Sequence, residues 1–190
     1  MQKFINNIYL IWFIPEEFKY FWAEYRSFFS ETSLYFLVAF CLSLATALNS
    51  SSFNEIGIVT FLFFLHLPFM YFFPKLLAYF LDHKAREMGA EGDIRILLSF
   101  CKYSLVIFML SCPFLIFVKS FEYNSSGVFL LFISFLSLLY FFNVARGLSL
   151  LYGLERSLAV KLVLSSVLSL LVLPFFFFIY YIVSLFSILL

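Results

Sequence analysis

The chain has 190 residues, of which 64% are hydrophobic and only 12% are charged, and its mean hydropathy is +1.04. A soluble domain is roughly half apolar and about a quarter charged, so this chain has too few charges to cover a surface that faces water. The composition therefore predicts an integral membrane protein in contact with a lipid bilayer. The net charge of +1 provides no strong field, so no nucleic acid partner is expected.

Residues 1–31 are predicted to form an amphipathic segment at the cytoplasmic interface. Pro15, followed by Glu16 and Glu17, is typical of the first turn of a helix. Aromatic residues then recur at intervals of three and four, which places them on one helical face. We expect this face to anchor the helix at headgroup depth, and the alternative is that it packs on the protein's own spans. The anchor residues are Phe18, Phe21, Trp22, Tyr25, Phe28 and Phe29.

Residues 32–190 are predicted to form an all-α bundle of five transmembrane helices. A bilayer core about 30 Å thick requires about 20 apolar residues in a helix. Five segments approach or meet this length: about 32–48, 56–81, 96–118, 127–145 and 158–190. The last segment is too long for one upright helix and contains Pro174. It is expected to be one kinked or tilted helix, with a hairpin as the alternative.

The distribution of basic residues predicts the orientation of the bundle. Eleven of the twelve Lys and Arg residues lie before the first span, between the second and third, between the fourth and fifth, or at the adjoining span ends. Only Lys119 lies on the other side. Short cytoplasmic loops carry such an excess, so the N-terminus is expected inside and the C-terminus outside.

The connection after residue 81 is the most charged part of the chain and is the candidate partner-docking loop. The alternative is a solvated loop that only joins two spans. Asp93 is placed to cap the following helix. The acidic residues and the single His give only weak evidence for a metal, so no metal or cofactor is expected. The candidate docking residues are Asp82, His83, Lys84, Arg86, Glu87, Asp93 and Arg95.

Two further polar features lie within the spans. His66 is near the middle of the second span, where an ionisable side chain is costly, so it marks a candidate polar site. A small-solute or ion transporter, or a channel component, is therefore the alternative function. A serine-rich face early in the fifth span is a candidate helix contact, either with a partner or within the chain: Ser165, Ser166 and Ser169.

Enzyme motifs do not occur in the sequence. It contains no Gly-rich phosphate loop, no His-Glu-x-x-His and no paired Cys motif. Cys41, Cys101 and Cys112 stand singly in or beside apolar runs, which is typical of packing residues. The prediction is a non-enzymatic membrane protein without catalytic residues.

Three stretches carry a family resemblance. The first runs from Pro15 to Trp22, the second comprises 81–83, 89–92, 94–97 and 103–104, and the third is 151–159. In order and spacing they resemble the Yip family, five-pass membrane proteins named for interaction with Ypt/Rab GTPases. Tyr152 stands where His is common in the family's His-Gly-Leu-Ser segment. The resemblance, closest to bacterial members, implies an inner-membrane adaptor or subunit that binds another membrane protein or itself as a homo-oligomer.

Overall fold

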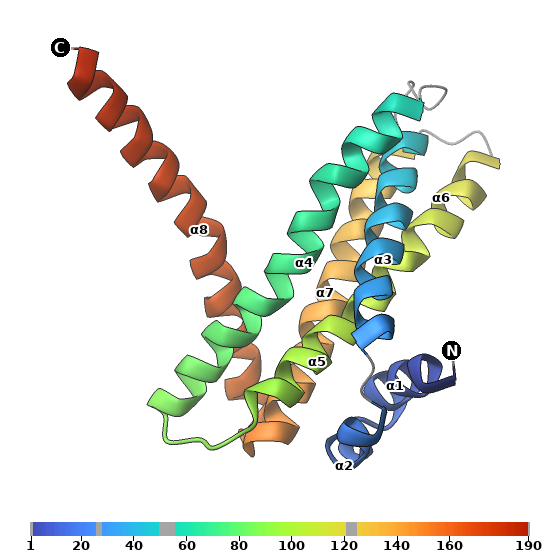
Figure 1. Ribbon diagram of the computed structural model, residues 1–190, viewed down its shortest axis with the longest axis vertical. Coiled ribbons are helices and arrows are strands. Elements are labelled where there is room, and N and C mark those ends of the chain that lie inside the picture. Colours follow the sequence, from blue (N-terminus) through green and yellow to red (C-terminus); the bar gives the residue numbers. More distant parts are fainter. Residues whose placement is uncertain (1, 26–27, 50–55, 121–124, 190) are drawn as a thin grey trace.

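The computed structural model describes residues 2–25, 28–49, 56–120 and 125–189, and it places side chains within 5–20, 32–49, 57–120 and 127–172. In these ranges the regular structure is entirely helical, which confirms the predicted all-α class (Figure 1). The elements are α1 (Gln2–Phe13), α2 (Pro15–Tyr25), α3 (Phe28–Asn49), α4 (Ile56–Glu87), α5 (Ile94–Ser104), the 3₁₀ helix η1 (Leu105–Leu110), α6 (Ser111–Ser120), α7 (Ser125–Tyr152) and α8 (Arg156–Leu189).

Four helical segments in the described part of the chain are long and apolar enough to cross a membrane. They are Thr32–Asn49, Gly57–Glu87, Ile94–Ser120 and Gly127–Tyr152. They overlap the first four predicted spans, and the second and fourth extend further than predicted, to Glu87 and Tyr152. The predicted fifth span lies on α8, which is one helix of 34 residues rather than a hairpin.

The helices form a bundle in which α3 packs on α4, α6 and η1, and α5 packs on α4 and α7 (Figure 1). α8 contacts α4 and α7 near its start and then diverges from the bundle. The connections 88–93 and 153–155 lie at the same end of the bundle as α1 and α2, whereas the C-terminus lies at the opposite end. Segments with a basic excess therefore share one end of the molecule.

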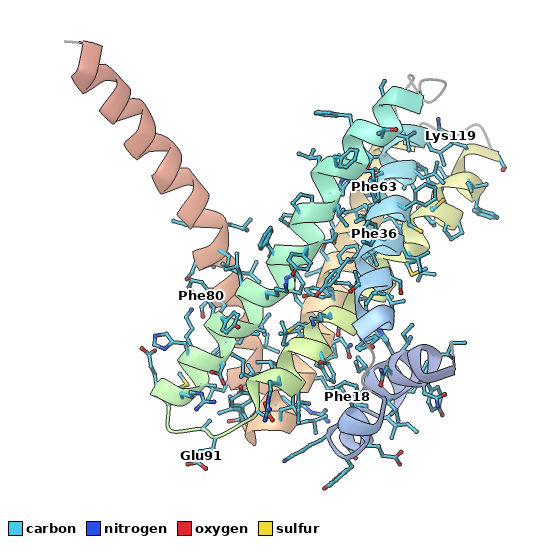
Figure 2. The ribbon with its side chains drawn as sticks, in the orientation of Figure 1. Phe18, Phe36, Phe63, Phe80, Glu91 and Lys119 are labelled. Carbon is cyan, nitrogen blue, oxygen red and sulfur yellow. The ribbon has the colours of Figure 1, made fainter. Side chains whose placement is uncertain are left out.

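The core is rich in aromatic side chains, and Tyr103, Tyr140 and Phe100 are almost completely buried. Much of the apolar surface nevertheless faces outward. In the apolar stretch of α4, only 11% is buried inside the bundle. Phe36 of α3 and Phe63 of α4 meet on this side with ring centroids 6.1 Å apart (Figure 2). An apolar exterior of this kind matches a lipid environment.

The third predicted span, 96–118, is built from three consecutive helical elements. α5 passes into η1 and then into α6. Pro113 lies in the first turn of α6, where it has no N–H to donate and its ring crowds the carbonyl four residues earlier. The tighter 3₁₀ turns before the proline accommodate this loss of regular hydrogen bonding.

The predicted docking loop is largely helical, which corrects its assignment as a loop. α4 continues to Glu87, so Asp82, His83, Lys84, Arg86 and Glu87 lie on its last turns. Gly89, with φ of 77°, ends the helix. The N–H of Ala90 donates to Ala85 O at 3.0 Å, and the N–H of Gly89 donates to Arg86 O at 2.9 Å. This pair of bonds is the Schellman motif.

α7 ends in the same way, seven residues beyond the predicted span 127–145. Gly153 has φ of 66°. The N–H of Leu154 donates to Ser149 O at 3.1 Å, which closes a second Schellman bond. α8 begins three residues after Gly153, at Arg156.

The N-terminal segment packs on the bundle. α1 has no counterpart among the predicted elements, whereas the helix start at Pro15 is confirmed by α2. Phe18 is fully buried, and its ring meets Phe100 of α5 edge-on with centroids 5.7 Å apart. The prediction of an interfacial anchor is therefore wrong for Phe18, which packs on the protein's own spans instead. The side chains of the other predicted anchors lie outside the described residues: Phe21, Trp22, Tyr25, Phe28 and Phe29.

Candidate functional site

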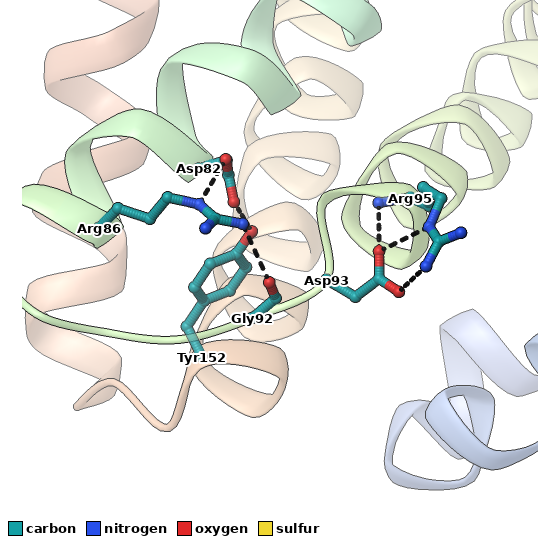
Figure 3. Close-up of polar contacts among 6 residues, drawn as sticks. All are labelled: Asp82, Arg86, Gly92, Asp93, Arg95 and Tyr152. Atoms are coloured by element: carbon teal, nitrogen blue, oxygen red, sulfur yellow. Dashed lines mark hydrogen bonds and ion pairs between the residues drawn. The ribbon is translucent and has the colours of Figure 1, made fainter.

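A cluster of polar side chains joins α4, the connection 88–93 and the end of α7 (Figure 3). Its centre is Asp82, whose side chain is only 12% exposed. The Tyr152 hydroxyl donates to Asp82 Oδ1. Arg86 Nε donates to Asp82 Oδ2 at 2.9 Å, and Arg86 Nη2 donates to the carbonyl oxygen of Gly92 at 3.3 Å. A buried carboxylate requires such donors, because an unpaired charge away from water is strongly destabilising.

Gly92 allows the connection to pass close to the Tyr152 ring. A Cβ atom at this position would lie 2.6 Å from Cε1 of the ring. Only glycine therefore permits this approach without displacing the tyrosine. The three elements are held together by both the hydrogen bonds of Asp82 and this backbone contact.

Asp93 and Arg95 form a second, more exposed pair at the start of α5 (Figure 3). Asp93 Oδ1 accepts a bond from the backbone N–H of Arg95 at 2.8 Å, which confirms the predicted cap. The Arg95 guanidinium donates to both carboxylate oxygens at 3.2 Å. These bonds from Arg95 lower the pKa of Asp93 below its usual value, although partial burial opposes the shift.

Of the remaining candidate docking residues, His83 and Glu87 face outward, whereas Lys84 reaches toward α8. His83 Nε2 and Glu87 Oε1 lie 3.3 Å apart, with side chains 74% and 62% exposed. Met88 follows them and is also exposed. Asp82 points the other way, toward Tyr152 and Arg86, so it does not share a site with His83 and Glu87. Within the described ranges, no three His, Cys, Asp or Glu residues come together as a metal-binding group.

The serine face of α8 lies partly against α4. Lys84 Nζ donates to Ser165 Oγ at 3.0 Å, which links the two helices. Ser166 is fully buried. Ser169 donates to the carbonyl oxygen of Ser165, within its own helix, at 2.8 Å. Two of the three serines therefore contribute to packing within the chain.

His66 is half-buried and lies beside α3. Its Nδ1 is 3.1 Å from Ser43 Oγ, and the Ser43 hydroxyl donates to Ala39 O at 2.7 Å. A hollow of about 310 Å³ between α3 and α4 is lined by Tyr35, Leu67 and Pro68 among others, but His66 is not one of its lining residues. The histidine therefore has a polar partner in the helix packing.

Tyr152 and Gly92 are the site residues that sequence reasoning did not assign. The available signal was Asp82 at the end of an apolar run, since a carboxylate in that position requires a nearby donor. The spacing of 70 residues between Asp82 and Tyr152 gives no local indication that they meet. Tyr152, Asp82 and Arg86 bond to one another and to the Gly92 carbonyl, and this geometry is suited to holding three elements together.

Comparison of the chain with protein-family models, with curated proteins and with solved structures gives no match. The class of protein therefore follows from the fold. Four long apolar helices with an outward-facing apolar surface indicate an integral membrane protein.

Proposed function

We propose that this chain is a non-enzymatic adaptor or subunit of the Yip type that binds another membrane protein through its cytoplasmic end. The observation that carries the proposal is the contrast within the end of α4. Asp82 and Arg86 brace the end against α7 and the connection, while His83, Glu87 and Met88 stand exposed on the same turns. A braced backbone presents these side chains with little loss of conformational freedom on binding.

The proposed topology adds α8 as a fifth span and places the N-terminus in the cytoplasm. Thirty-four helical residues extend about 51 Å at about 1.5 Å per residue, which is long enough for the helix to cross the bilayer at a tilt. No charged residue follows Lys161. The bacterial inner membrane is the proposed location, on the family resemblance.

The proposal assigns the interfacial helix to α1, in place of the aromatic face predicted from residue 18 onward. Ile5, Tyr9 and Phe13 recur every four residues on α1 and are 54%, 51% and 70% exposed. The Tyr9 and Phe13 rings stack with centroids 5.4 Å apart. Aromatic side chains on an exposed helical face suit the headgroup region of a bilayer.

Transport has less support than binding. The ring of His66 meets Ser43 on α3, which is the arrangement of a satisfied packing residue. An ion or solute site would instead require the ring to face a wet cavity together with other polar groups.

The test is purification from the native membrane in a gentle detergent, with mass spectrometry of retained proteins. The probe variant changes His83→Ala, Glu87→Ala and Met88→Ser together, and the matched control changes exposed Lys19→Ala and Tyr20→Ser on α2. A stoichiometric second membrane protein that is lost only from the probe variant supports the proposal. Recovery of the chain alone, or equal retention by both variants, contradicts it.

A further inference from the structure

We propose that a hollow between α7 and α8 binds an anionic phospholipid, with the phosphate against Arg146 and Arg156 and an acyl chain in the adjoining apolar groove. The hollow has a volume of about 290 Å³ and is lined by Phe142, Ala145, Arg146, Arg156 and Val160. This site is separate from the Asp82 cluster and from the proposed docking residues.

The apolar groove continues directly from this hollow. A second space of about 180 Å³ shares Phe142, Ala145 and Val160 with it and contains no charged lining residue. Its other lining residues are Leu138, Phe141, Val163 and Leu164. A single molecule with a charged head and an apolar tail would fill both spaces.

Among the residues whose side chains the structure describes, the two arginines differ from Arg86 and Arg95 in having no acidic partner. Arg86 bonds to Asp82 and Arg95 bonds to Asp93. Neither Arg146 nor Arg156 forms a hydrogen bond or ion pair with another residue in the described ranges. Glu155 precedes Arg156, but its Oε1 accepts from Ser157 Oγ at 2.8 Å. Two guanidinium groups are thus available to a phosphate, which they match in charge and in hydrogen-bonding geometry.

The charged and apolar parts of the site are arranged along the helices in the order that a lipid requires and a free phosphate does not. Arg146 lies near the end of α7 and Arg156 begins α8, at the end of the bundle that carries the connections. Leu138 and Leu164 are each eight residues from an arginine, about 12 Å along the helix toward the opposite end. Basic pockets between helices on the cytoplasmic side bind anionic headgroups by this arrangement.

The groove is open to the bilayer. Phe142 is 68% exposed, Leu138 65% and Leu164 50%. A lipid can therefore enter sideways from the membrane without any movement of the helices.

The test uses the full chain in phosphatidylcholine nanodiscs that contain a minor fraction of phosphatidylglycerol, with retained lipids counted by native mass spectrometry. At the usual contribution of a basic residue near an anionic headgroup, the two arginines give roughly 30-fold enrichment of phosphatidylglycerol over phosphatidylcholine. The double variant R146Q/R156Q is expected to lose this enrichment, and R146K/R156K, which keeps both charges, is expected to retain most of it.

The matched control is K19Q/K161Q, which removes two exposed charges from the same end of the molecule without touching the hollow. Enrichment should survive in this control. Equal loss in both double variants would mean general surface attraction and would overturn the site. Displacement of bound lipid by inorganic phosphate at comparable concentration would overturn the requirement for an acyl chain.

Discussion

Replacing Tyr152 by Phe tests whether the Asp82 cluster stabilises the fold. The change removes the hydroxyl that donates to Asp82, whose side chain is only 12% exposed. Among the described contacts of Asp82, Arg86 is then the remaining donor. Hydrogen bonds to charged groups contribute about 1.5–3 kcal/mol, so Y152F is expected to reduce the free energy of unfolding by about that amount. R86Q should cost less, because the Arg86 side chain is 56% exposed and its ion pair is screened by water.

The measurement is reversible unfolding in mixed micelles with increasing SDS, followed by far-ultraviolet circular dichroism. Y79F is the matched control, since Tyr79 is also on α4 but is 59% exposed. It should change the free energy of unfolding by less than about 0.5 kcal/mol. A cycle of Y152F, D82A and the double variant isolates the pairwise energy. Equal effects of Y152F and Y79F, or additivity throughout the cycle, would refute the reasoning.

Three other substitutions test the close contacts and the helix ends by the same unfolding assay. G147A would place a Cβ 2.5 Å from Phe100 Cδ1 and should destabilise by about 1–3 kcal/mol, whereas G127A, which has open space, should be neutral or stabilising. G89A should cost about 1–2 kcal/mol because φ there is 77°, and G89N should cost less. D93A should lose about 1 kcal/mol of capping. Because the folded pKa of Asp93 lies below its usual 3.8, its charge-dependent stabilisation is complete above that pH and is lost as the pH falls through the folded value. D93N should remove this acid-dependent part, and an unchanged acid profile in D93N would contradict the assignment.

The apolar runs were sufficient to predict where four long apolar helices lie, because burial in lipid requires long stretches without charge. They were insufficient to locate where α4 and α7 end. Both helices continue into charged or mixed sequence and stop at a glycine with positive φ, at Gly89 and at Gly153. Hydropathy does not report the backbone conformation that ends each helix.

The residues of the site were only half predictable. Asp82, Arg86 and Asp93 were selected for their charge, but the structure turns Asp82 inward and leaves His83 and Glu87 outside. Which side of a helix is covered depends on the neighbours that pack there, and Tyr152 comes from a helix far along the chain. Phe18 shows the same limit, because an aromatic stripe looks identical whether it meets lipid or Phe100.

The separation between Asp82 and Tyr152 has a consequence for synthesis of the chain. Asp82 emerges from the ribosome 70 residues before the tyrosine that completes its hydrogen bonds. Until then, Arg86 and the turn at Gly89 can form locally, while the carboxylate still faces water or the insertion machinery. The hydrogen bond that ties the end of α4 to α7 can therefore form only after residue 152 has been synthesised.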